Sequence, residues 1–190
     1  ALTLLILEIK APLASEIQSS ADLWHSLQHL APSFFAFLLS FAIIVISWVN
    51  HHALMKGINK STPYFIYANT FLLLTIVIIP FPTELLAEFF MTNAASTAVV
   101  MYCLVILSTN IGWILITWSA LKPKPLSKNE ESKARLQTVH SQAKMAFLLY
   151  FTCTILAFWY PVLVSIIITL SWIFWLFTSI TNRDNHHLEG

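Results

Sequence analysis

The longest stretch without a charged residue, positions 145–182, constrains the fold more than any other feature of the sequence. None of its 38 residues is Asp, Glu, Lys or Arg. A single helix of that length would measure about 57 Å, whereas the hydrocarbon core of a bilayer is about 30 Å thick. We therefore predict two membrane-spanning helices, at about 145–159 and 161–181. They are separated at Trp159-Tyr160-Pro161, because proline cannot continue a helix.

The composition and three further uncharged stretches predict an all-α membrane protein. Hydrophobic residues make up 57% of the chain and charged residues only 10%, against about 25% charged residues in soluble domains. The further stretches, 32–50, 63–83 and 94–121, are each long enough for a span of about 20 residues. Together with the pair above they amount to five complete spans.

The first residues of the chain suggest a sixth span. Residues 1–9 are as apolar as the complete spans but too short to cross a bilayer. We interpret them as the second half of a span whose first half is missing from this sequence; a short interfacial strand or a cloning remnant is the alternative. The prediction is a six-span helical bundle forming one transmembrane domain over 1–182. A charged linker at 122–144 contains a predicted polar helix, and the tail at 183–190 is expected to be partly a cloning remnant.

The positive charges predict the orientation of this bundle. With six spans, the connections after residues 50 and 121 and the C-terminus lie on one side of the membrane. Nine of the ten lysines and arginines lie on that side, and only Lys10 lies on the other. Because positive residues collect on the cytoplasmic side, both termini are expected to be cytoplasmic. The nine residues are Lys56, Lys60, Lys122, Lys124, Lys128, Lys133, Arg135, Lys144 and Arg183.

Several functional classes are excluded by what the sequence lacks. A net charge of +1 provides no basic surface for nucleic acid, and three glycines cannot form a phosphate-binding loop. No ionisable residue lies at the centre of a predicted span, where proton-coupled transporters usually keep one. The sequence has neither a Thr-Val-Gly-Tyr-Gly potassium filter nor a Gly-x-Ser-x-Gly nucleophile motif. We therefore expect neither an enzyme nor a bound cofactor.

Histidines are the ionisable residues nearest to the predicted spans. His51 and His52 close the span at 32–50, and adjacent residues point about 100° apart on a helix, so they cannot both bind one metal. His25 and His29 are spaced i, i+4 before that span, which suits a divalent metal such as zinc. Such a Zn²⁺ is expected to inhibit. Ordinary interfacial histidines are the alternative in both places.

Thr3 and Leu7 are also spaced i, i+4 and share one face of the N-terminal helical segment. A ring of such helices would place a hydroxyl layer beside an apolar layer, and apolar constrictions can gate channels by dewetting. The pattern is compatible with a pore, and simple packing of membrane helices is the alternative.

Three motifs together resemble a known family. They are the N-terminal segment at 1–12, the Trp-x-x-His-His sequence at 48–52, and Asn69-Thr70-Phe71 followed by Pro80-Phe81-Pro82-Thr83. Their order and spacing are similar to the prokaryotic branch of the transmembrane protein 175 family of potassium channels. The resemblance is specific over residues 1 to about 86 and beyond that rests on the number of spans.

The resemblance implies a homotetramer in the prokaryotic plasma membrane that conducts K⁺ passively through a central pore lined by the first span. It implies that Thr3 and Leu7 form layers of the pore, and that the family's main constriction and its Arg-x-x-x-Phe-Ser-Asp signature would precede residue 1. Trp48, His51, His52 and Asn69 would form a structural or gating network around that signature rather than bind the ion.

Two other functions fit the same residues. A proton- or solute-coupled secondary transporter would use His51 and His52 as its titrating site. A membrane scaffold without transport activity would need none of these side chains. The channel predicts current steps that depend on Thr3 and Leu7, whereas the transporter predicts saturable, coupled flux that depends on the two histidines.

Overall fold

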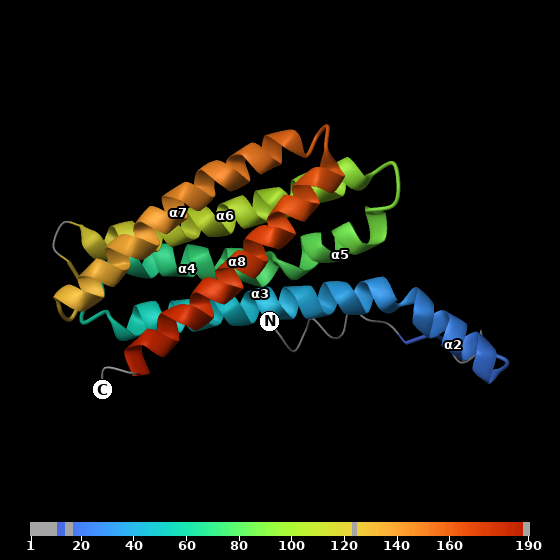
Figure 1. Cartoon of the computed structure of the whole chain (residues 1–190), viewed down its shortest axis with the longest axis horizontal. Coiled ribbons are helices and arrows are strands. Elements are labelled where there is room, and N and C mark those ends of the chain that lie inside the picture. The colour runs from blue at the N-terminus through green and yellow to red at the C-terminus, as the bar shows by residue number, and fades with distance from the viewer. Residues whose placement is uncertain (1–10, 14–16, 123–124, 188–190) are drawn as a thin grey trace.

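The computed structural model describes residues 11–13, 17–122 and 125–187, and most of this part of the chain is helical. The side chains of a few positions at 32–39, and of all positions from 178 on, are not described. The described residues contain no strand, only an isolated antiparallel bridge between Ile58 and Ser127. The helices are α2 (Ser20–His29), α3 (Ala31–Lys56), α4 (Pro63–Ile78), α5 (Pro80–Phe89), α6 (Ala95–Leu121), α7 (Glu130–Leu156) and α8 (Pro161–His187) (Figure 1).

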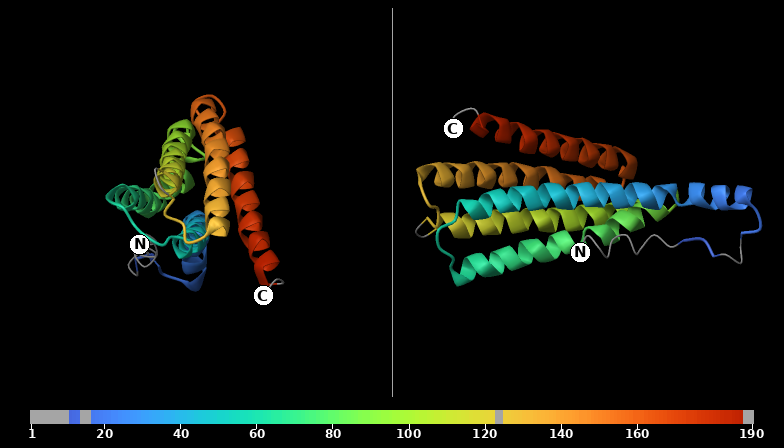
Figure 2. Two further views of the ribbon diagram at one scale, coloured as in Figure 1. Left: turned by 90° about the vertical axis from the view of Figure 1, so that its left-hand side faces the viewer. Right: turned by 90° about the horizontal axis from the view of Figure 1, so that it is seen from below.

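Helices α3 to α7 form an elongated bundle in which α6 is central. Helix α6 packs against α4, α5, α7 and α8, while α3 packs mainly against α5. Helix α8 crosses the bundle obliquely on its outside, and α2 extends beyond one end (Figures 1 and 2). The connections α3–α4 and α6–α7 and the end of α8 lie together at the opposite end of the bundle (Figure 1).

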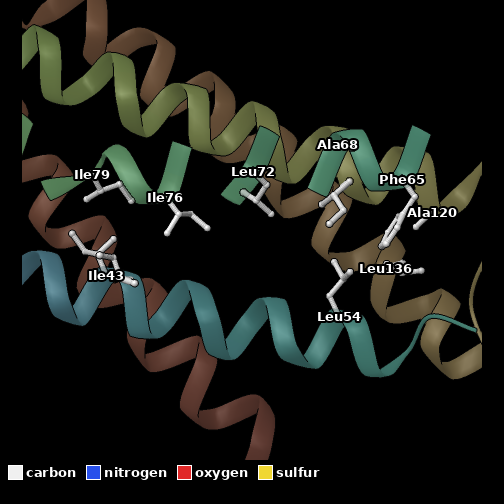
Figure 3. Packing of buried hydrophobic residues seen from close by; sticks show 11 residues of the cluster. Ile43, Leu54, Phe65, Ala68, Leu72, Ile76, Ile79, Ala120 and Leu136 are labelled. Carbon is white, nitrogen blue, oxygen red and sulfur yellow. The ribbon is translucent and has the colours of Figure 1, made fainter. Parts of the chain in front are cut away.

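Two clusters of buried apolar side chains hold the bundle together. The first joins α3, α4, α6 and α7, with Ile43, Leu72, Ile79 and Ile116 almost completely buried (Figure 3). The second joins α6, α7 and α8. Many other large apolar side chains on these helices are exposed, as expected for helices that face lipid rather than water.

Two stretches of the described residues are long and apolar enough to cross a membrane: 63–89, which contains α4 and α5, and 95–121, which is α6. Pro161–Phe177 is a shorter apolar helix. The described helices run close to the residues expected to form spans, but the count of six spans stays a prediction.

The expected single helix at 63–83 is interrupted. Helix α4 ends at Ile78, and α5 begins at Pro80 and continues to Phe89. Pro80 has no N–H to donate to the preceding turn, so the regular hydrogen-bond ladder breaks there. The hydroxyl of Thr83 donates to the carbonyl of Ile79 at 2.8 Å, which satisfies a buried acceptor next to the break.

The polar linker predicted at 122–144 is not separate from the span that follows it. Helix α7 runs without interruption from Glu130 to Leu156 and so combines the expected polar helix with the first half of the long uncharged stretch. The side chain of Asn129 accepts a hydrogen bond from the N–H of Ser132 at 2.8 Å and caps its start. The charge boundary at Lys144 therefore lies inside one continuous helix.

The break predicted at Trp159-Tyr160-Pro161 coincides with the turn between α7 and α8. Pro161 is the first residue of α8, a position that tolerates its missing N–H. The hydroxyl of Ser96 at the start of α6 donates to the carbonyls of Ala157 and Phe158, at 3.0 and 3.2 Å. The turn is thereby attached to the neighbouring helix, and acceptors left open at the end of α7 are satisfied.

Candidate functional site

Four of the candidate residues lie on α3 and α4 and form two pairs. His51 on α3 and Asn69 on α4 are joined by a hydrogen bond of 2.6 Å between Nε2 and Oδ1. Because a carboxamide oxygen can only accept, Nε2 of His51 is the donor. This bond connects the C-terminal part of α3 to the middle of α4, across the α3–α4 connection.

The second pair lies along α3 alone. The rings of Trp48 and His52 are stacked, with centroids 5.5 Å apart and an angle of 13° between their planes. Both side chains are exposed, and Trp48 retains 63% of its accessible surface. Helix α3 continues to Lys56, one turn beyond His52, so the helix extends past the predicted span at 32–50.

The pore candidates Thr3 and Leu7 lie outside the described residues. The structure therefore says nothing about the layers that they were predicted to form.

His25 and His29 lie on α2, with ring centroids 4.5 Å apart in an edge-on arrangement. Within the described residues no three His, Cys, Asp or Glu side chains are grouped as a metal site would require. Asp22 lies one turn before His25, and its hydrogen bond with Ser19 lowers the pKa of its carboxyl group. The pair thus offers two imidazole ligands, and any further ligands of a zinc ion would have to come from elsewhere.

Sequence reasoning missed a further histidine, His140 on α7. Its Nδ1 lies 2.9 Å from the hydroxyl of Thr117 on α6, which itself donates to the carbonyl of Trp113 at 2.7 Å. Burial, followed by the positive charges of Lys144 and Lys122, lowers the pKa of His140. The residue is inconspicuous in the sequence because it lies in a polar segment, and only the packing of α6 on α7 reveals its partner.

Comparison with known proteins identifies the family. The family described as endosomal/lysosomal potassium channel TMEM175 matches residues 1–80. A potassium channel of Chamaesiphon minutus is 31% identical over 173 residues, which cover 90% of this chain and 85% of that protein. The chain belongs to the TMEM175 family.

A second relative and a solved structure are also similar to this TMEM175 chain. A potassium channel of Streptomyces collinus is 34% identical over 119 residues, covering 62% of this chain and 56% of that one. The crystal structure of a lysosomal potassium-selective channel TMEM175 homolog from Chamaesiphon minutus superimposes with a TM-score of 0.77 and 30% identity, covering 94% of this chain and 89% of that one. The structural match covers 94% of this chain. The similarity to this family, which the sequence motifs show over about the first 86 residues, therefore extends to the fold of nearly the whole chain.

Proposed function

We propose that this TMEM175 chain is a subunit of a passive, potassium-selective cation channel in a prokaryotic plasma membrane. The observation that carries the proposal is membership of a family whose relatives are named potassium channels, together with a fold shared over nearly the whole chain. A bundle with its apolar side chains exposed along α4, α7 and α8 is the form expected for a protein that works inside a bilayer.

The proposed pore is formed by four copies of the chain, each contributing its first span. Thr3 would provide a ring of hydroxyl groups and Leu7, one turn away, an apolar ring. A pore of this kind has no cage of carbonyl oxygens, so it would discriminate between monovalent cations only modestly.

Within this proposal, the His51–Asn69 bond holds α4 against α3 and sets the position of the helices behind the pore. A histidine engaged in a 2.6 Å bond with a neutral amide acts as a structural donor. This supports a positioning role for His51 rather than contact with the permeating ion. The coupled transporter, in which His51 and His52 titrate, is the outcome that the following experiment would favour if the channel proposal failed.

Single-channel recording of the full-length protein in planar bilayers, with K⁺ on one side and Na⁺ on the other, tests the proposal. We expect discrete currents that reverse toward the potassium equilibrium potential, and a change of conductance or selectivity in Thr3→Val and Leu7→Ala. Thr152→Val and Leu148→Ala are matched controls, since these exposed residues have the same i, i+4 spacing on α7. Their currents should equal those of the unmodified protein.

Silent bilayers together with substrate-coupled uptake into liposomes, abolished by His51→Gln, would overturn the channel proposal. Equal effects of the α7 controls and of the N-terminal variants would overturn the assignment of the pore.

A further inference from the structure

A cavity of about 630 Å³ lies between α3, α6, α7 and α8. The described lining residues that are exposed all belong to the end of α3 or the first half of α7; they are Lys56, Glu131, Ala134, Arg135 and Thr138. Those contributed by α6 and α8 are half-buried or buried. The cavity therefore opens between the C-terminal end of α3 and the first half of α7, toward the end of the bundle where the α3–α4 and α6–α7 connections lie together (Figure 1).

This mouth and its surroundings carry an excess of positive charge. Lys56 and Arg135 line the cavity, with Glu131 as the acidic residue among the described lining residues. The two connections and the first turn of α7 add four lysines, Lys60, Lys122, Lys128 and Lys133. Glu130 is the further acidic residue there, and it pairs with Lys133 at 3.0 Å. Such a surface attracts anionic groups.

Beyond the mouth the lining becomes apolar and buried. Ala143, Ala146 and Tyr150 on α7 and Ile106 on α6 are all buried, and the half-buried Trp172 of α8 lies opposite them across the cavity. Arg135 and Tyr150 are about four helical turns, or about 22 Å, apart along α7. A cavity that is long, apolar inside and positively charged at its mouth suits an amphiphile with an anionic head and an extended hydrocarbon chain.

We propose that this cavity binds a phospholipid with an anionic headgroup, of the phosphatidylglycerol class, from the membrane leaflet at this end of the bundle. The phosphate lies at the mouth with Lys56 and Arg135, since a guanidinium matches the geometry of phosphate oxygens. One acyl chain extends along α7 toward Tyr150. Basic pockets between membrane helices are a known kind of site for anionic lipid headgroups. Because binding is measured without a current, its failure would leave the proposed channel function untouched.

Native mass spectrometry of the detergent-solubilised full-length protein, titrated with phosphatidylglycerol or phosphatidylcholine of identical acyl chains, tests the proposal. Phosphatidylglycerol carries a net negative charge, whereas phosphatidylcholine carries none. We expect phosphatidylglycerol to bind roughly five-fold or more tightly, the effect of about one cation near an anionic headgroup.

Charge variants locate the headgroup. Lys56→Gln and Arg135→Gln should each weaken the binding of phosphatidylglycerol roughly five-fold. Lys60→Gln and Lys144→Gln are matched controls, because both remove an exposed lysine that does not line the cavity. They should change the affinity by less than about two-fold, since solvent and salt screen their charges.

Filling the cavity locates the acyl chain. Ala146 is 5% exposed and lines the cavity, so Ala146→Phe should weaken the binding of phosphatidylglycerol although both cations remain. Met145→Phe adds the same ring at the neighbouring position, which is 71% exposed, and should leave binding unchanged. If Ala146→Phe does not fold, competition decides: inorganic phosphate, which has no chain, should fail to displace the lipid.

Equal affinities for the two lipids, or no retained lipid, would overturn the proposal. Equal losses in all four charge variants would also overturn it, because the lipid would then be attracted by the basic surface as a whole. Displacement by inorganic phosphate at the same concentration as the lipid would show that the acyl chain contributes nothing, and would overturn the assignment of the cavity to a lipid.

Discussion

The bond between His51 and Asn69 joins two helices through residues that the sequence had already singled out. The sequence singled out Asn69, and its connection to His51, through family resemblance alone, because 18 positions separate the two residues and neither helical periodicity nor local spacing relates them. The bond depends on the turn between α3 and α4, which returns Asn69 to the level of His51.

We expect His51 and Asn69 to be energetically coupled. A double-mutant cycle of His51→Ala and Asn69→Ala, measured by thermal unfolding in detergent, should give a coupling of about 0.5–1.5 kcal/mol, the usual net contribution of a hydrogen bond. The matched control is a cycle of His52→Ala with Asn69→Ala, which should be additive because His52 stacks on Trp48 instead. Coupling in the control cycle, or none in the first, would contradict the assignment.

His140 should make stability depend on pH. Its folded-state pKa is lowered from the ordinary value of 6.5, chiefly by burial. In the interval between the lowered pKa and 6.5 the unfolded chain binds more protons than the folded protein, so stability falls as the pH is lowered through that interval. The melting temperature should therefore fall between pH 7 and pH 5, and fall less in His140→Gln. His29→Gln, at an exposed histidine of α2, should retain the full dependence.

The sequence does not distinguish the polar residues in the middle of α6 from one another. Asn110 follows Ser108 and Thr109 in an otherwise apolar span, a polar interruption that is a possible signal of function. Serine and threonine in membrane helices usually donate to their own helix, as Ser108 and Thr109 do here. Among the residues that the structure describes, Asn110 differs from them because its Oδ1 is buried without a hydrogen-bond partner, which the sequence does not reveal.

At the level of elements, proline predicted helix boundaries better than charge did. The turn before Pro161 was predicted because a 38-residue stretch had to be divided and proline offered the place. The break at Pro80 was missed, although the same chemistry applies, because the stretch 63–83 was short enough for one span. The continuity of α7 was missed because the change from polar to apolar composition was interpreted as a boundary between elements.

Helices α4 and α6 approach each other closely at Gly112. A Cβ atom added at this buried glycine would lie 2.9 Å from the Cα of Leu72, so α4 and α6 would have to separate. Gly112→Ala should therefore destabilise the protein by about 1–3 kcal/mol, as overpacking generally does, even though alanine favours helix. Thermal unfolding in detergent measures this.

Gly57→Ala is the control for that prediction. Its added Cβ would meet no atom nearer than 3.2 Å, and the nearest is a side-chain atom of Ser132. The backbone of Gly57 is in the right-handed helical region, with φ of −80°, which alanine adopts readily. Its effect should be much smaller, and equal losses in the two variants would show that α4 and α6 do not meet at Gly112.

For the whole molecule, the fold brings to one end of the bundle the same connections that the positive charges predict on one side of the membrane. These are the α3–α4 and α6–α7 connections and the end of α8 (Figure 1). Lys60 lies in the α3–α4 connection at one end of the bundle, and Met91 lies after α5 at the other (Figure 1). The placement of these ends relative to the cell follows from the positive-inside rule and is a prediction.

Labelling of single cysteines in intact cells checks this orientation. Met91→Cys, at a position that is 91% exposed, should react with a membrane-impermeant maleimide in intact cells. Lys60→Cys should react only after the cells are permeabilised. The native Cys103 and Cys153 are buried and should contribute little background. Reaction of Lys60→Cys in sealed cells would reverse the orientation.

The bridge between Ile58 and Ser127 has a consequence for the order of events during synthesis. Two backbone hydrogen bonds form the bridge, from the Asn59 N–H to the Leu126 carbonyl and from the Lys128 N–H to the Gly57 carbonyl. Ile58 and Ser127 themselves are 69 positions apart. At about 5–20 residues per second, a ribosome needs on the order of 3–14 s to extend the chain from one to the other. During that time the α3–α4 connection exists but has no residues 126–128 with which to form these hydrogen bonds. The bridge can close only after α6 has been made, so nascent chains that stop short of residue 127 never acquire it.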